Sequence, residues 1–327
     1  MFSQSGRRTL AACVRMIGLA PNMDSVLAAK GKTFHWARRL LGSHHGTRAT
    51  RLYAFCRAVD DFADESASHS TARTALVECE RAIKLGESYN LQFKDMLELM
   101  RECKIDSNIV LELIRGVATD LEPVHVGTVD ELLHYCYRVA GTVGLMMCRV
   151  LDVDDSAAYP HAIDLGIAMQ LTNICRDVGL DASCGRRYLP AELIGDIPAS
   201  LLEIPSSSLR PKLQRSIAEL LQLADTYYSS GERGLAYLPL EARGAILVAG
   251  RTYRAIGTRL LRHGGDYWSQ RIVVPPLSKL GITCQSLLTR PLQSAFWRRP
   301  WYHDVRLHTA LAGLPCVSGS DIARYGG

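Results

Sequence analysis

The sequence lacks the features that mark several common classes of protein. No apolar run approaches the ~18 residues of a membrane-spanning helix, and the stretch from Leu10 to Ala20 is short and interrupted by Arg15. None of the ten cysteines belongs to a Cys-x-x-Cys pair, so we expect buried, reduced thiols in a cytoplasmic protein. The net charge is only +5, and no nucleic-acid-binding module is recognisable, so we expect no nucleic-acid partner.

Helical periodicity dominates the sequence, and 47% of its residues are hydrophobic, enough for a large core. Runs of β-branched residues are short, prolines cluster between the helical stretches, and nothing repeats at a fixed period. These features predict one all-α domain over residues 26–289, with residues 1–25 and 290–327 as extensions. Helices are expected at about 26–42, 47–66, 70–86, 91–103, 107–118, 129–150, 155–180, 208–233, 239–266 and 276–282.

Two pairs of aspartates stand out, Asp60 with Asp64 and Asp177 with Asp181. On a helix, residues four apart lie on one face, where like charges destabilise the helix by a few tenths of a kcal/mol. Two such pairs in apolar surroundings indicate a bound cation. Carboxylate oxygens are the ligands that magnesium prefers, usually together with substrate phosphates.

Each pair is the end of a longer polar stripe on its helix. At 100° per residue, the stripes are Tyr53-Arg57-Asp60-Asp64 and Gln170-Asn173-Asp177-Asp181. The second stripe continues toward the N-terminus into Gly166 and Ile163, which are apolar. This pattern fits a ligand with a metal-chelating anionic head and a hydrocarbon tail, such as a polyprenyl diphosphate. Solvated helix faces with salt bridges are the alternative.

Nearby arginines add to the polar end of both stripes. Arg57, Arg176, Arg186 and Arg187 are able to clamp phosphate oxygens, because a guanidinium group presents paired donors.

A third informative segment runs from Tyr135 to Gly144. Gly141 and Gly144 lie inside a helical pattern, where each glycine costs roughly 1 kcal/mol relative to alanine. The small residues allow either another helix or a long substrate to approach the backbone closely. The sequence alone does not distinguish these two interpretations.

These segments together resemble the squalene/phytoene synthase family, and the sequences of the motifs are most similar to those of bacterial phytoene synthases. The similarity covers roughly residues 28–282 in the expected order. It rests on Tyr53–Asp61, Tyr135–Gly144 and Gln170–Gly179 through Arg187–Pro190, with further matches at Gly231–Gly234 and Tyr253–Gly257. The resemblance implies an all-α isoprenoid-synthase helical bundle with a central active-site cavity.

The resemblance also implies roles for individual residues. Magnesium, with manganese as an alternative, would be held by Asp60, Asp61 and Asp64 from one side and by Asn173, Asp177 and Asp181 from the other. Tyr135 would lie near the reacting carbons, and the four outer aspartates would share in catalysis. The diphosphates would contact Tyr53, Arg57, Gln170, Arg176, Arg187, Tyr188, Tyr253 and Arg271. The prenyl channels would be lined by Phe34, Val139, Val143, Gly144 and Met169.

The implied reaction is the head-to-head condensation of two geranylgeranyl diphosphates, through prephytoene diphosphate, to phytoene. No NADPH is expected, and no Gly-x-Gly-x-x-Gly motif follows a strand. One alternative is a C30 synthase that makes dehydrosqualene or hydroxysqualene from farnesyl diphosphate. Another is a non-catalytic scaffold with the same fold, which the retained aspartates argue against.

Two features of the sequence depart from this pattern or extend it. Leu180 stands where the family usually carries an acidic residue, but it lies about 100° from Asp181 on the helical wheel, off the metal stripe. The segment Phe296–Tyr302 combines aromatic and basic residues, which suits either a peripheral contact with a membrane surface or packing on the domain. Oligomeric state is not readable from the sequence.

Overall fold

Local capping sets the ends of several helices. The computed structural model describes residues 40–65, 68–289 and 294–317. At the start of α5 (His69–Leu85), the Ser68 side chain accepts a hydrogen bond from the backbone of Thr71, and Gly86 ends the helix with a φ of 72°. Asn90 and Asp106 cap the next two helices in the same way.

The described residues form helices and no strands, which confirms the predicted all-α class. Several predicted ranges agree closely with the observed helices, whereas the predicted helix 26–42 lies almost entirely outside the described residues. The α-helices are α4 (Gly42–Glu65), α5 (His69–Leu85), α6 (Leu91–Cys103), α7 (Ser107–Ala118), α8 (Val129–Cys136), α9 (Thr142–Val150), α10 (Tyr159–Ser183), α11 (Ala191–Ile194), α12 (Ser200–Glu203), α13 (Arg210–Arg233), α14 (Leu240–Arg262), α15 (Pro276–Thr289) and α16 (Ser294–Trp297).

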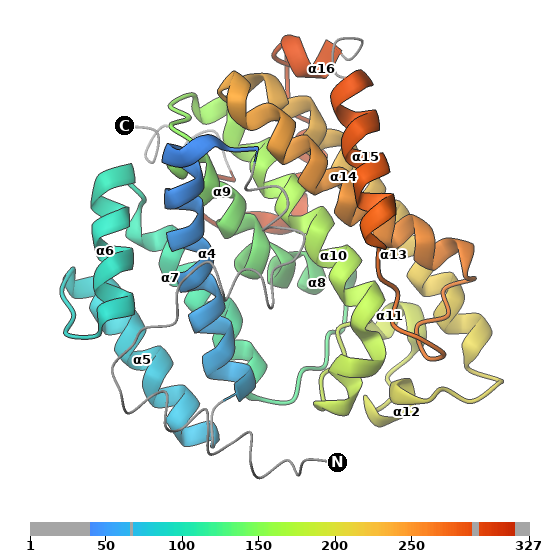
Figure 1. Cartoon of the computed structure of the whole chain (residues 1–327). Helices are drawn as coiled ribbons and strands as arrows, with labels where there is room; N and C mark the ends of the chain where they lie inside the picture. Colours follow the sequence, from blue (N-terminus) through green and yellow to red (C-terminus); the bar gives the residue numbers. More distant parts are fainter. Residues whose placement is uncertain (1–39, 66–67, 290–293, 318–327) are drawn as a thin grey trace, which may run out of the picture.

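Helix α10 runs through the middle of the bundle (Figure 1) and packs against α9, α13 and α14. Its buried side carries Ile163, Ile167, Leu171 and Ile174, spaced as one face of a helix requires. Each of these side chains is at most 3% exposed, so α10 is the centre of the core. The polar residues of its other side are consequently held in fixed positions.

The predicted helix 129–150 is interrupted by a π turn, η2 (Tyr137–Gly141), between α8 and α9. The interruption lies where this segment crosses α10 at very short range. A Cβ atom added to Gly166 would lie 2.3 Å from the carbonyl oxygen of Ala140, and one added to Gly144 would lie 2.2 Å from that of Ala162. These distances support close helix packing as the reason for the small residues. The π turn itself is a feature that is frequent at functional sites.

The described part of the C-terminal segment, residues 294–317, packs on the bundle. Phe296 is buried against Leu235 and Leu247, while the 3₁₀ helix η6 (Val305–Leu311) and Cys316 join the main core. This packing agrees with the second interpretation of the aromatic and basic tail. Trp301, at its tip, is fully exposed.

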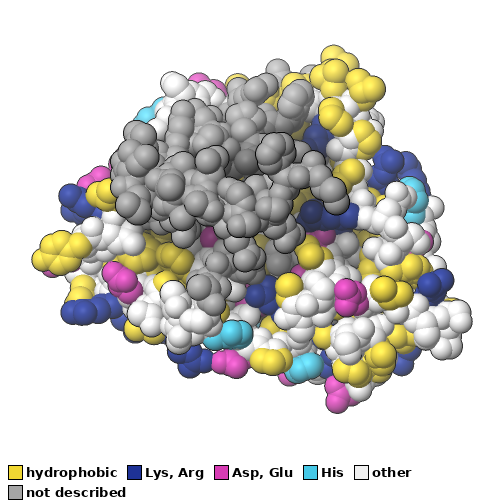
Figure 2. Space-filling view, turned by 60° about the horizontal axis from the view of Figure 1, so that its bottom comes forward, with side chains coloured by type: hydrophobic (Ala, Val, Ile, Leu, Met, Phe, Trp, Pro, Cys, Tyr) yellow, Lys and Arg dark blue, Asp and Glu magenta, His cyan; other side chains and the backbone are white. Residues whose placement is uncertain are grey.

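On the face drawn in Figure 2, the acidic and basic side chains of the described residues lie interspersed and form no large patch of one charge. This mixture agrees with the small net charge of the chain. Among the described residues, no helix is long and apolar enough to cross a membrane.

The close crossing predicts that Gly166→Ala destabilises the protein. The new methyl group would overlap the Ala140 carbonyl, and overpacking of this kind costs about 1–3 kcal/mol. Urea unfolding of purified protein measures the change. Gly281→Ala is the matched control, because Gly281 lies in α15 with no atom within 4 Å of an added Cβ, so this variant gains up to about 1 kcal/mol. Equal stability of the two variants would contradict the packing.

Candidate active site

A polar pocket of about 270 Å³ lies between α4 and α10 and brings the two predicted stripes together. From α4 it receives Arg57 and Asp60, and from α10 Asn173, Asp177 and Asp181. Asp64 belongs to the last turn of α4, but its side chain is outside the described part of the structure. The remaining polar lining consists of Asp120, Tyr135, Gln170, Arg176, Arg186 and Tyr188.

Asp177 is largely enclosed in this pocket, with 14% of its side chain exposed. Arg176 donates from Nε at 2.9 Å, and Arg271 donates from Nε at 3.0 Å and from Nη2 at 3.2 Å. Burial alone would raise the pKa of Asp177, but the hydrogen bonds from these two arginines bring it below its usual value. The carboxylate therefore stays ionised and is compensated by guanidinium groups that a phosphate would also attract.

Two buried polar atoms of the pocket residues have no hydrogen-bond partner among the described residues. One is the Nε donor of Arg57, whose Nη2 contacts Asp61 at 2.5 Å. The other is Oδ1 of Asn173, whose amide nitrogen donates weakly to Gln170 at 3.4 Å. Buried polar groups are nearly always satisfied in folded proteins, so this donor is available to an anion and this acceptor to a cation.

Asp120 is a site residue that the sequence patterns did not reveal. The hydroxyl groups of Tyr135 and Tyr188 donate to its two carboxylate oxygens at 2.9 and 2.6 Å. The two rings are stacked with centroids 4.7 Å apart. Burial, followed by the nearby Asp120 charge, raises the pKa of both tyrosines, so their hydroxyl groups remain protonated and bound. Asp120 thereby fixes the orientation of the aromatic pair.

Asp120 was missed because it lies in a short 3₁₀ turn, η1 (Thr119–Leu121), where helical periodicity ends. The signal that was available is its place directly after an apolar helix and shortly before Pro123. An acidic residue there has no repeat pattern to distinguish it from an ordinary loop residue.

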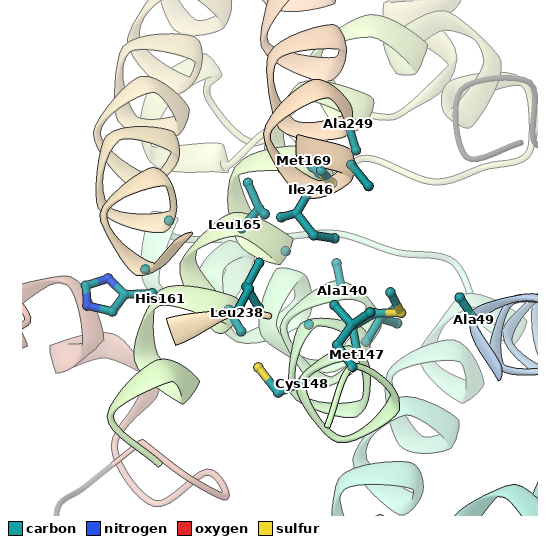
Figure 3. Close-up of a pocket in the computed structure, with 18 of the residues that line it drawn as sticks. Ala49, Ala140, Met147, Cys148, His161, Leu165, Met169, Leu238, Ile246 and Ala249 are labelled. Atoms are coloured by element: carbon teal, nitrogen blue, oxygen red, sulfur yellow. The ribbon is translucent and has the colours of Figure 1, made fainter. Parts of the chain in front are cut away.

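An apolar cavity of about 310 Å³ adjoins the polar pocket, and Val139, Gln170 and Asn173 line both. Figure 3 shows Ala140, Met147, Leu165 and Ile246 pointing into it from several helices, and Leu238 from the turn before α14. The predicted residues Tyr53, Val143, Gly144, Met169 and Tyr253 also line it, as does Gly166. Its volume lies at the lower end of the range for small-molecule sites.

The structure does not bring every predicted residue into these pockets. Arg187 was predicted to contact substrate, but its side chain is 1% exposed. Its guanidinium group donates to the carbonyls of Val126 and Leu189 and to Asp196, which ties two loops together. The physical reason is that burial of a guanidinium group requires several acceptors, and these loops supply them.

Four further predicted or noted positions complete the comparison. Ile163 is part of the core and not of the cavity wall. Asp61 contacts Arg57 without lining either pocket, and Leu180 is exposed, off the polar stripe, as the helical wheel indicates. Phe34 lies outside the described residues.

The sequence model of the squalene/phytoene synthase family matches residues 27–278. The chain belongs to this family. A 15-cis-phytoene synthase from Enterobacter agglomerans is 32% identical over 291 residues, which cover 82% of this chain and 98% of the relative. One from Paracoccus sp. is 35% identical over 277 residues, covering 82% and 90% respectively. The family resemblance drawn from the sequence is thus confirmed, and with it a prenyltransferase type of enzyme.

Solved structures support the fold. A dehydrosqualene synthase bound to a ligand superposes with a TM-score of 0.71 at 23% identity, covering 83% of this chain and 96% of that structure. A squalene synthase from Alicyclobacillus acidocaldarius gives 0.59 at 22% identity, covering 71% and 94%. The isoprenoid-synthase fold is therefore confirmed. Enzymes of the family are metal-dependent and act on prenyl diphosphates.

The arrangement around Asp120 predicts that Asp120→Asn destabilises the fold. The neutral amide offers one acceptor oxygen, so one tyrosine hydroxyl loses its acceptor and the other donates to an uncharged group, at a cost of about 1.5–3 kcal/mol. Chemical denaturation provides the measurement. Asp106→Asn is the control, since Asp106 caps α7 and asparagine caps equally well, within about 0.5 kcal/mol. An unchanged Asp120→Asn protein would show that Asp120 does not hold the tyrosines.

Proposed function

We propose that this chain is a phytoene synthase, which joins two geranylgeranyl diphosphates head to head and releases both diphosphates. The observation that carries the proposal is that the polar pocket adjoins the apolar cavity, with Val139, Gln170 and Asn173 lining both. A diphosphate head and a prenyl tail have the same division into charged and apolar parts. The bacterial relatives named 15-cis-phytoene synthase support the C20 substrate.

The donor set of the polar pocket fits magnesium, with manganese as an alternative. Carboxylates of Asp60, Asp177 and Asp181 line one pocket with the unpartnered oxygen of Asn173, and hard divalent cations prefer such oxygen ligands. These four residues would hold the metal. When bound, magnesium neutralises negative charge on the departing diphosphate.

The arginines of the pocket bind the diphosphates in this proposal. The unpartnered Nε of Arg57 is directed to a phosphate oxygen, and Arg176 and Arg186 line the same pocket. Arg271 has a 60% exposed side chain and pairs with Asp177, so it can exchange its carboxylate for a phosphate as substrate arrives.

The apolar cavity protects the carbocations that this reaction generates. Loss of the first diphosphate leaves an allylic cation, which the double bond of the second substrate attacks. Loss of a proton then gives the cyclopropyl intermediate, prephytoene diphosphate. A second ionisation, rearrangement and proton loss give phytoene, so the sequence of steps consumes no reductant and NADPH is not needed.

The side chains of the two pockets would exclude water and hold an aromatic ring in a fixed orientation. Aliphatic walls exclude the water that would quench a cation. The Tyr135 ring lines the polar pocket and is fixed through Asp120, and it offers a cation about 0.5–2 kcal/mol of stabilisation.

The proposal predicts that purified protein with Mg²⁺ and geranylgeranyl diphosphate yields phytoene. Farnesyl diphosphate is the parallel substrate, and a C30 hydrocarbon formed from it in preference would establish the alternative C30 synthase. Products are identified by chromatography with mass spectrometry. No hydrocarbon from either substrate would favour the non-catalytic scaffold instead.

The same assay tests the metal ligands. We expect Asp60→Ala and Asp177→Ala to lower turnover by at least about 100-fold, because a metal ion contributes several kcal/mol to such a transition state. Asp154→Ala, at an exposed position outside both pockets, serves as the control and keeps wild-type turnover. Full activity of either pocket variant would remove the metal assignment.

We further propose that this cytoplasmic enzyme contacts membranes peripherally through the exposed aromatic residues of its C-terminal segment. Trp297, Trp301 and Tyr302 are exposed beside Arg298 and Arg299, a combination that suits the interface of an anionic bilayer. Deleting the segment would also remove buried core residues, so point substitutions are the appropriate test.

The expected result is that Trp301→Ser with Tyr302→Ser reduces co-sedimentation with vesicles containing anionic lipid. Tyr89→Ser is the matched control, since Tyr89 is equally exposed but lies between α5 and α6, and binding should persist. Undiminished vesicle binding by the double variant would refute the assignment of this surface.

A further inference from the structure

A second cluster of ligand-type side chains lies apart from the polar pocket. Asp164, on the buried side of α10, is 0% exposed. Its Oδ2 is 2.7 Å from Nε2 of His303, and its Oδ1 is 2.9 Å from Nε2 of His308. The two histidines belong to the C-terminal segment, 139 and 144 residues further along the chain. The sequence patterns gave no indication that these three residues meet.

The charge of this cluster is compensated differently from that of the polar pocket. Within the described residues, the ion-pair partners of Asp164 are the two histidines, and no arginine or lysine pairs with it. A buried carboxylate is costly unless a positive charge or a metal accompanies it. Neutral imidazole N–H groups hydrogen-bond such a carboxylate without cancelling its charge.

The ligand atoms have the types and the spacing of a transition-metal site. The two imidazole nitrogens and the carboxylate oxygen all lie within 4.8 Å of one another. A tetrahedral zinc ion with bonds of about 2.0–2.1 Å separates its ligand atoms by about 3.3 Å. His303 now contacts Oδ2 at 2.7 Å and His308 contacts Oδ1 at 2.9 Å, so each imidazole needs to withdraw from its own carboxylate oxygen by about 0.5 Å.

Neighbouring groups fix the orientation of these imidazoles. The His161 ring packs edge-to-face against His303 with centroids 5.2 Å apart, and the rings of His303 and His308 lie 4.5 Å apart. Nδ1 of His161 hydrogen-bonds the carbonyl of Ser230 at 2.8 Å, which holds the ring in place. In Figure 3, this ring lies at the edge of the apolar cavity and points away from the other labelled side chains.

We propose that Asp164, His303 and His308 form a zinc site that fastens the C-terminal segment to α10. Mixed imidazole and carboxylate ligands select zinc or a similar transition metal over magnesium, which prefers oxygen alone. The metal is thus structural and separate from the ions proposed to act on diphosphate. It stabilises a segment that also places Phe296, Leu311 and Cys316 in the cores.

A second group with the same residue types provides the matched control. His44, His45 and Asp152 are also close together, but Asp152 is half exposed and already paired with Arg48 at 2.8 Å. With its charge compensated by a guanidinium group and water, this carboxylate has little need of a metal. His45→Gln should therefore leave the metal content unchanged.

The test is elemental analysis of the full-length chain, purified without a metal-affinity tag or chelator. We expect wild type and His45→Gln to carry about one zinc per chain. We expect Asp164→Asn, His303→Gln and His308→Gln to lose it, with Co²⁺ binding to the chelator-treated protein weakened by more than about 100-fold. Chelation should lower the melting temperature of wild type and leave that of Asp164→Asn unchanged.

The wild-type protein alone decides the question if a cluster variant fails to fold. A folded wild-type chain that holds no stoichiometric zinc and binds no Co²⁺ overturns the proposal, and the cluster is then a hydrogen-bonded clasp only. Retention of zinc by Asp164→Asn overturns it as well. Metal content does not depend on turnover, so failure of the proposed synthase activity would be seen separately.

Discussion

The backbone of α10 passes very close to the segment that contains the π turn. Gly166 of α10 lies against the carbonyl group of Ala140, and Gly144 lies against that of Ala162 in α10. This short distance brings the polar side of α10 and the wall that contains Val139 to a common boundary. A larger residue at either glycine would separate the two elements and open that boundary to water. The polar pocket and the apolar cavity adjoin at this boundary, where Val139, Gln170 and Asn173 line both.

The two aspartates on opposite sides of α10, Asp177 and Asp164, have different kinds of counterion. On the polar side, Asp177 is surrounded by guanidinium groups, one of them on a largely exposed side chain that is able to move. On the core side, the ion-pair partners of Asp164 within the described part of the chain are imidazoles, and its side chain has no access to solvent. A site that must admit and release charged ligands uses exchangeable counterions, whereas a carboxylate in the core requires a permanent one.

Local patterns were sufficient to predict much of this molecule. The helices and the stripes of Asp60 and Asp177 follow from the 3.6-residue period, which needs only neighbouring residues. Arg187 shows where such reasoning ends. The sequence analysis assigned it, like Arg176, to phosphate binding, yet the Arg187 guanidinium group ties loops together and that of Arg176 lines the pocket. Asp120 and Asp164 were missed because their partners are brought together by tertiary packing, which no local period encodes.

The distance along the chain between Asp164 and its partners has a consequence for the folding of the protein. Contacts that join residues 139 to 178 positions apart, including the hydrogen bond from Tyr137 to Pro315, can form only after long loops have closed. Until the C-terminal segment docks, part of the apolar surface around α10 has no cover. The chain should therefore pass through a partly folded intermediate that is prone to aggregation, so its yield on refolding should depend strongly on protein concentration.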